Sequence, residues 1–489
     1  MERSSVKRSR ALRLVFVAGA LIVLLLFALF VPSSLWEQDW AVLGLVTALT
    51  VVGAHLFPGG ALCWPNVFLV LLTLFHLGYL LLVKHALVPA NPHMPGIDAP
   101  HVPLAFQLFA VACIAFALGA AVAGFIPVGS PPPRDPPDSS AVLVLGLAVS
   151  GFGIMAFLLY VGQVGGPVAL LNSSYGAYWS FLNNGDPRLG TMAFHYLPAG
   201  LLVLYGAVRR FPEPLRLRLR IPLVVAFLSF TMLLLWLGNR GSAFLSAVAL
   251  LYVHHLWYKK FNALHVGLLC GVVLLTIPVV AQLRNIDPSH RRLALDSVET
   301  SPLDGIAEMG GAIRPYLAFL DLFGESRVRL ERLGWVPYRA ALADVIPNLS
   351  SRKSADESEG YVRADTWITQ QVDRVAADEG FGLGSSPIGE AFAAYGTTGV
   401  IVTFLVLGCG IAYLERFFAE AHSYYGMAAV GLLFYSLNWF VRDDIFGLVR
   451  PVIWALILLG LTRAAQALLG TKGGPFPLTQ HEQDLAHQD

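Results

Sequence analysis

Residues 381–408 read FGLGSSPIGEAFAAYGTTGVIVTFLVLG, a glycine-rich turn that leads directly into an apolar run. From Ile388 onward the run carries one charged residue, Glu390. It is long enough to cross the hydrocarbon core of a bilayer, which takes about 20 apolar residues in a helix. The stretch therefore predicts a transmembrane helix with a polar group at its start, where the helix dipole favours a carboxylate.

The rest of the chain repeats this pattern. Of its 489 residues, 56% are hydrophobic and 13% are charged, against about 25% charged in a typical soluble domain. The composition predicts an all-α, polytopic helical membrane protein. We expect about twelve transmembrane helices, at 12–31, 40–57, 62–83, 103–125, 141–161, 191–208, 221–238, 242–258, 263–281, 391–414, 424–441 and 446–468. The net charge of +1 gives no argument for a nucleic-acid partner.

Lysine and arginine residues in the short loops predict the orientation, because they collect on the cytoplasmic side. With a cytoplasmic N-terminus, the short outer loops hold four: Lys84, Arg188, Arg240 and Arg442. The cytoplasmic segments hold sixteen: Arg3, Lys7, Arg8, Arg10, Arg13, Arg134, Arg209, Arg210, Arg216, Arg218, Arg220, Lys259, Lys260, Arg416, Arg463 and Lys472. An even number of spans then places both termini in the cytoplasm. The N-terminus resembles a signal sequence, but we expect it to remain as the first span, because no A-x-A site follows.

A long hydrophilic stretch, 282–390, falls on the outer side in this topology. Within it, AIRPYLAFLDLF and PYRAALADVI place apolar residues at helical spacing. We expect short amphipathic helices that lie on the membrane face as a cap. The predicted organisation is an N-terminal transmembrane bundle (1–281), this loop or cap (282–390), C-terminal transmembrane helices (391–468) and a cytoplasmic tail (469–489).

A set of arginines falls on the predicted outer side, which should be poor in positive charge. Five arginines belong there: Arg240, Arg284, Arg314, Arg442 and Arg450. Arginine among membrane spans is costly and usually marks a functional site, and guanidinium groups bind phosphate bidentately. Taken singly, a loop arginine such as Arg284 or Arg314 is better explained as a solvated charge than as a ligand, and the alternative for Arg240 is a snorkelling turn arginine. Taken together, they predict a pocket for a polyanion, most simply a lipid-linked phosphate.

The glycine-rich turn before the quoted span is the second candidate. Gly382, Gly384 and Ser386 lie where backbone N–H groups at a helix start can face an oxyanion. Glu390, just inside the helix, is a candidate general base or an orienter of an acceptor hydroxyl. The alternative is that its carboxylate only caps the helix.

We expect no metal and no cofactor. Asp443 and Asp444 follow Arg442, and an Arg–Asp pair that staples the turn explains them at least as well as a metal site. His93, Asp98 and His101 have no spacing typical of a zinc site. The four cysteines lie in or beside apolar segments and suggest no disulfide framework.

With these residues considered together, the chain resembles bacterial oligosaccharide repeat-unit polymerases of the O-antigen polymerase family. The resemblance rests on an Arg-Gly turn (Arg240), a long loop opening with Arg284, and an E-x-G pattern at Glu308 followed by Arg314. It is strongest in G-x-G-x-S-x-I-x-E-x-Y-x-N-F-G-x-x-G. That pattern is matched by Gly382, Gly384, Ser386, Ile388, Glu390, Gly396 and Gly399, while Phe392, Ala394 and Tyr395 depart from it.

The resemblance implies a membrane glycosyltransferase of the C-type superfold in the bacterial inner membrane, with its active site facing the periplasm. The growing glycan would pass from undecaprenyl diphosphate to the acceptor sugar of a new lipid-linked repeat unit, for O-antigen or exopolysaccharide. Glu390 or Glu308 would serve the acceptor hydroxyl and the five arginines the diphosphate. Implied partners are the undecaprenyl-diphosphate-linked oligosaccharide, membrane lipids and a chain-length regulator.

Three other functions remain open. An O-antigen ligase would share the superfold and the donor, but it should carry a critical histidine in the loop, where His290 stands alone. A lipid-linked oligosaccharide flippase or transport component needs no long external loop and normally shows paired halves. A non-catalytic subunit of an export complex is the third.

Overall fold

The computed structural model describes most of the chain, and every regular element in the described residues is a helix. The described residues are 2–36, 38–57, 59–91, 94, 99–126, 138–172, 187–237, 239–261, 263–283, 286, 301–324, 332–345, 363–378, 382–421 and 424–469. The longer helices are α1 (Glu2–Phe30), α3 (Asp39–Leu56), α4 (Trp64–Lys84), α5 (Val102–Ala123), α6 (Asp138–Gln163), α9 (Pro187–Ala207), α10 (Glu213–Trp236), α11 (Arg240–Trp257), α12 (Ala263–Leu283), α19 (Pro387–Ala421), α20 (Tyr424–Trp439) and α21 (Ile445–Leu469).

Each of the twelve expected spans coincides with one of these helices, so the all-α, polytopic fold class is confirmed. By length and apolarity, seven helices of the described chain are able to cross a membrane: residues 39–56, 64–84, 102–123, 140–163, 213–236, 387–418 and 445–465. Two shorter apolar helices cover 14–30 and 241–257. The number twelve therefore stays a prediction.

The bundle is organised around α5, whose side chains are almost all buried. Its main partner is α19, and the two backbones touch. A side chain at Gly119 of α5 would meet the backbone of Leu405, and one at Gly408 of α19 would meet the backbone of Phe116. Small residues at such crossings let membrane helices approach closely, which replaces the hydrophobic driving force that lipid removes.

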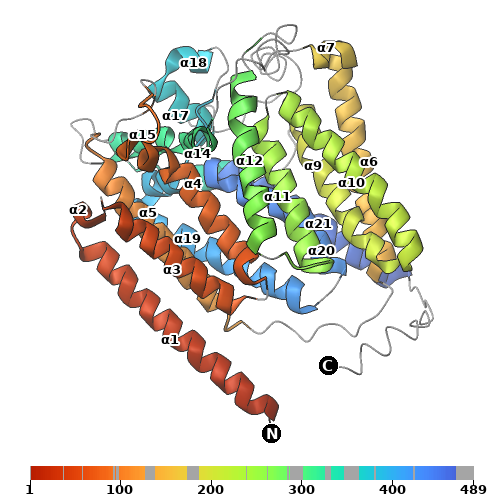
Figure 1. Cartoon of the computed structure of the whole chain (residues 1–489), viewed down its shortest axis with the longest axis horizontal. Coiled ribbons are helices and arrows are strands. Elements are labelled where there is room, and N and C mark those ends of the chain that lie inside the picture. The colour runs from red at the N-terminus through yellow and green to blue at the C-terminus, as the bar shows by residue number, and fades with distance from the viewer. Residues whose placement is uncertain are drawn as a thin grey trace.

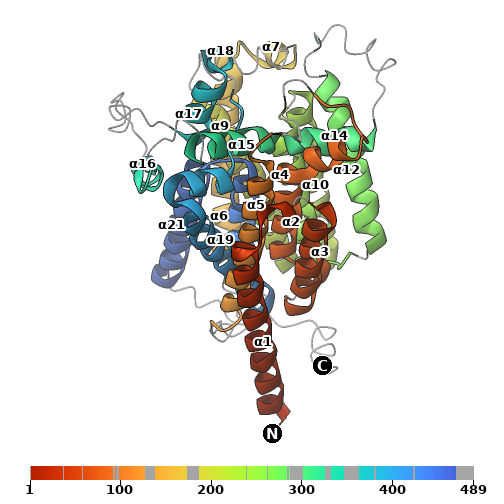
Figure 2. The same ribbon diagram turned by 90° about the vertical axis from the view of Figure 1, so that its left-hand side faces the viewer.

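Short helices follow α12 and precede α19 in the sequence, as the amphipathic pattern predicted. They are α14 (Pro302–Met309), α15 (Ile313–Phe323), α16 (Val336–Ala343), α17 (Ala364–Val372) and α18 (Arg374–Asp378). Four of them, α14, α15, α17 and α18, lie together at the end of the molecule opposite to the start of α1 (Figures 1 and 2). We call this the cap end. Helix α16 lies apart from them and packs against α21 (Figure 2).

The start of α14 shows why the chain turns into helix here. The Ser301 hydroxyl accepts a hydrogen bond from the Leu303 N–H, and the Asp304 carboxylate accepts one from the Ser301 N–H. This reciprocal arrangement satisfies two amides that would otherwise lack partners. Pro302 occupies the first helical position, where its missing N–H has no cost.

Candidate active site

The turn at residues 382–386 is fixed to the cap end of α4 by a buried serine–histidine pair. The Ser386 hydroxyl lies 2.8 Å from Nε2 of His76 and accepts the Gly389 N–H at 3.2 Å. Nδ1 of His76 lies 3.1 Å from the Leu72 carbonyl, which places the ring proton on Nδ1 and makes Nε2 the acceptor. Ser386 therefore caps α19 and at the same time holds its start against α4.

Part of the turn's backbone is already used inside the protein. The Ser385 N–H donates to the Arg442 carbonyl at 3.2 Å, and the Leu383 N–H donates to the Thr369 hydroxyl at 3.0 Å. Gly384 has φ of +77°, a conformation that glycine adopts without strain. The prediction of an oxyanion-binding turn consequently rests on the amides of Gly382 and Gly384, while Ser386 serves as a cap.

Glu390 is buried, and its carboxylate reaches a neighbouring helix. Oε2 accepts the N–H of Ile445, the first residue of α21, at 2.9 Å, and 4% of the residue is exposed. The sequence suggested that Glu390 caps its own helix, and there the Ser386 hydroxyl accepts the Gly389 N–H. Glu390 thus stabilises the positive end of the α21 dipole and joins α19 to α21.

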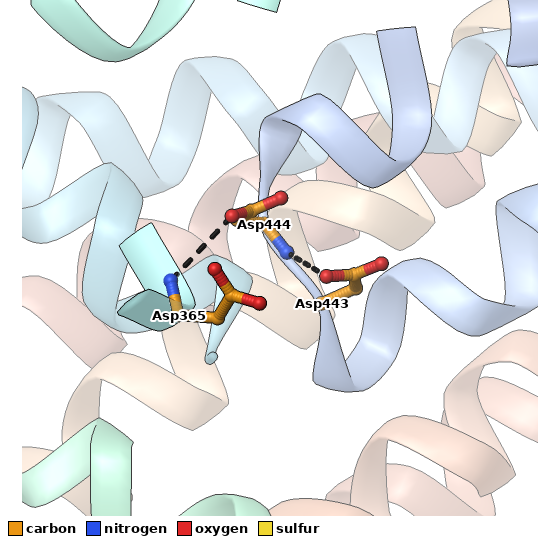
Figure 3. Close-up of side chains that lie close together, drawn as sticks. All are labelled: Asp365, Asp443 and Asp444. Carbon is orange, nitrogen blue, oxygen red and sulfur yellow. Dashed lines mark hydrogen bonds between the residues drawn. The ribbon is translucent and has the colours of Figure 1, made fainter. Parts of the chain in front are cut away.

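Beside this junction, Asp365, Asp443 and Asp444 form what we call the three-aspartate cluster (Figure 3). Each offers a carboxylate oxygen within 4.8 Å of the others. The Arg363 guanidinium lies among them, 3.4 Å from Asp443, 3.4 Å from Asp444 and 3.5 Å from Asp365. These oxygens are the donor set a divalent cation prefers, but the guanidinium already supplies a positive charge to all three.

The electrostatics of this cluster follow from its burial. Burial and the neighbouring Asp444 carboxylate raise the pKa of Asp443 to about 7, and the Arg363 guanidinium opposes that rise. The Asp444 carboxylate, which is fully buried, is the largest cause that holds the pKa of Arg363 well above its usual value. Burial beside a second carboxylate therefore favours the protonated, neutral form of Asp443.

Arg363 is a residue that sequence reasoning missed. The sequence paired Asp443 and Asp444 with the adjacent Arg442, and the structure adds Arg363 as a partner of both carboxylates. Arg442 turns its guanidinium over the rings of Trp439 and Phe75, at 5.2 and 5.6 Å from their centroids. The available signal was the Arg-x-Asp pattern at the start of α17, in RADTW.

Of the five predicted arginines, the structure describes the side chains of Arg314, Arg442 and Arg450. The Arg442 guanidinium lies beside both glycine turns, since it would be 3.6 Å from a Cβ at Gly241 and 3.9 Å from one at Gly384. Arg314 pairs with Asp373 at 3.2 Å, and Arg450 pairs with Asp344 at 3.4 Å.

The remaining candidates are less fully described. Arg240 begins α11, but its side chain, like all of Arg284, lies outside the described residues. Glu308 is half-buried on α14, which packs against α4 and α12. Of the zinc candidates, His93 and Asp98 lie outside the described residues, and His101 is 3.1 Å from Asp321.

This geometry gathers a buried carboxylate, a glycine turn and guanidinium groups at the cap end of a membrane bundle. A sequence model of the O-antigen polysaccharide polymerase Wzy family matches residues 146–469, well over half of the chain. The chain belongs to this family. The matched region includes the 382–386 turn, Glu390 and the three-aspartate cluster. No curated protein and no solved structure matches the chain.

Membership agrees with the motif resemblance in the sequence and establishes an integral membrane polymerase of the O-antigen type. Within the matched region, the glycine turn leads into the start of α19, and Arg442 lies beside this turn. His76, which is buried and hydrogen-bonded through both ring nitrogens, lies outside the match.

Proposed function

We propose that this protein polymerises lipid-linked oligosaccharide repeat units at the periplasmic face of the bacterial inner membrane. It would transfer the growing glycan from undecaprenyl diphosphate to the acceptor sugar of a new repeat unit. The observation that carries the proposal is the position of Glu390 in a chain of the O-antigen polymerase family. Its buried carboxylate lies where the start of α19, the start of α21 and the turn that holds Arg442 meet.

The reaction needs a base and a cation, and no redox step. An acceptor hydroxyl oxygen forms a bond to C1 of the donor sugar, and the bond from C1 to the diphosphate oxygen breaks with its electron pair. Undecaprenyl diphosphate leaves, and the hydroxyl proton passes to a carboxylate, for which we propose Glu390, with Glu308 as the alternative. Glu390 accepts one backbone N–H at Oε2, which orients the carboxylate for this role.

Arginine side chains supply the charge that the leaving group requires. Arg442 lies beside the glycine turn, and we place Arg240 and Arg284 with it on the diphosphate; Arg314 and Arg450, each paired with an aspartate, would form the rim. Guanidinium groups stabilise developing phosphate charge without a metal. We therefore propose a metal-independent reaction.

The cap contributes by covering the site. Helix α15 packs on α19, with Phe319 against Gly389 one residue before Glu390. A site closed in this way excludes water and favours transfer to a sugar over hydrolysis. We therefore also propose the domain division made from the sequence, in which residues 282–390 form a periplasmic cap over the N-terminal and C-terminal groups of membrane helices.

A reconstituted reaction separates this function from its rivals. The full chain in lipid nanodiscs is mixed with undecaprenyl-diphosphate-linked repeat units, and products are resolved on a gel. A ladder of repeat units with release of undecaprenyl diphosphate is expected. Transfer to lipid A core without a ladder would show the ligase, and movement of the lipid across vesicles without bond formation would show a flippase.

A further inference from the structure

Helix α19 is interrupted within the membrane-spanning region. Tyr395 has φ −138° and ψ 22°, and Gly396 has φ +64° and ψ −151°. Residues with a side chain rarely adopt the Gly396 conformation. The break separates a first piece, 387–394, which carries Glu390, from a second piece, 397–421.

A break leaves the carbonyls of the preceding turn without their usual helical partners, which is costly in a membrane. Here three consecutive residues of the cap replace those partners. Nη1 of Arg332 donates to the Phe392 carbonyl at 2.5 Å. The next two amides of the segment, at 333 and 334, donate to the carbonyls of 393 and 394, each at 3.1 Å.

Side-chain contacts of the same segment strengthen this attachment at the break. The Arg332 guanidinium lies 4.3 Å from the centroid of the Phe392 ring. Trp335 and Tyr338 place their rings 5.7 and 6.5 Å from the ring of Tyr395. The Tyr338 hydroxyl lies 3.3 Å from the Thr403 hydroxyl on the second piece. Residues 332–338 therefore hold both pieces of α19 at a fixed angle.

We propose that Arg332 is a positioning residue, which sets the place of the Glu390 carboxylate by clamping the end of the helical piece that carries it. Phe392 is two residues after Glu390, and the other end of the same piece is held by Ser386 on His76. With both ends fixed, the carboxylate keeps its hydrogen bond to the Ile445 N–H. This inference rests on the proposed role of Glu390.

The test compares two variants with similar unbranched stems. Arg332→Met keeps the stem over Phe392 but removes all donors, and Arg332→Lys keeps one donor. Arg339→Ala, at an exposed arginine of α16, is the control. Because a displacement of about 1 Å at a reacting group costs up to about a hundredfold in rate, Arg332→Met should lower kcat roughly ten- to a hundredfold. KM for the acceptor should stay within about threefold, Arg332→Lys should recover part of kcat, and Arg339→Ala should leave kcat unchanged.

Combination with Glu390→Gln separates positioning from general stability. If Arg332 acts through the carboxylate, Arg332→Met should cost less than about twofold once Glu390 is glutamine, since coupled residues are not additive. An equal loss in both backgrounds, or a normal kcat for Arg332→Met, would overturn the proposal. Full activity of Glu390→Gln alone would instead refute the proposed base.

Hydrogen exchange supplies a readout independent of turnover. The amides at 333 and 334 are covered by the carbonyls of 393 and 394, so Arg332→Met should speed exchange in a peptide spanning 332–338 and leave α5 unchanged. Unaltered exchange there would show that Arg332 clamps nothing. If Arg332→Met does not accumulate, Gly396→Ala disturbs the same break from the helix side and must give the same loss confined to kcat.

Discussion

Replacement of Glu390 by glutamine separates a catalytic carboxylate from a structural one. The glutamine carbonyl can still accept the Ile445 N–H that Oε2 accepts at 2.9 Å, so the junction between α19 and α21 keeps its hydrogen bond. Only the charge at the start of α21 is lost, and this should cost about 1 kcal/mol or less of stability. Glu390→Ala would instead leave that buried N–H unsatisfied, at about 1–3 kcal/mol.

The effect on the reaction should be much larger. A base or orienting carboxylate contributes roughly two orders of magnitude or more to turnover, which corresponds to about 2.7 kcal/mol of transition-state stabilisation. Glu390→Gln should therefore leave a product stalled near one repeat unit while the protein remains folded and inserted. Arg240→Lys and Arg284→Lys, which keep charge but lose bidentate geometry, should also shorten the product.

The assay is glycan ladder length in a deletion strain, with the amount of membrane protein followed by blot. Glu390→Ala serves as the comparison, because it should lower both protein level and ladder length. Ladders of normal length from Glu390→Gln and from both lysine variants, at normal protein level, would refute the assignment of the site.

Four further outcomes are expected. Impermeant labelling of intact cells should reach cysteines placed in 325–360 but not in 210–218, and the reverse would overturn the argument from outer arginines. EDTA should leave polymerisation in nanodiscs unchanged; loss of activity with rescue by magnesium would show that the three-aspartate cluster binds metal. The pKa of Asp443 is raised to about 7 in the folded protein, whereas an unfolded aspartate releases its proton near pH 4. The folded protein therefore loses stability as the pH rises from about 4 to about 7. Asp443→Asn should therefore raise the melting temperature more at pH 8 than at pH 5, and a larger gain at pH 5 would contradict this. Gly408→Ala should lower the melting temperature because its methyl group meets the α5 backbone, while Gly410→Ala, with open space around it, should be neutral; equal effects would refute close α5–α19 packing.

The positions of the helices were predictable from the sequence, because a membrane demands long apolar runs with internally satisfied backbones. The break in α19 was not. Gly396 stands in an apolar run where glycine is common in membrane helices, and the partners of the freed carbonyls begin at Arg332, some sixty residues away.

The site was predictable only in part, for a similar reason. Glu390 and the turn before it are adjacent in sequence, so their shared location at a helix start could be read directly. Ser386 and His76, which are hydrogen-bonded, are 310 positions apart in the sequence, and Arg363 and Asp444 are 81 positions apart. The Arg-x-Asp pattern marks Arg363 as a candidate, but charge and hydrogen-bonding capacity at one position do not specify a distant partner.

The close crossing of α5 and α19 has a consequence for biosynthesis. Helix α5 ends at Ala123 and its partner begins at Pro387, so a ribosome adding roughly 5–20 residues per second needs tens of seconds to deliver that partner. During this time the face of α5 around Gly119, which packs on Leu405 in the finished protein, lacks its partner. The predominantly apolar surface of α5 lets it wait in the bilayer without aggregating. Nascent chains arrested before residue 387 should therefore already hold α5 as an inserted span, with its later binding surface open to crosslinking from acyl chains.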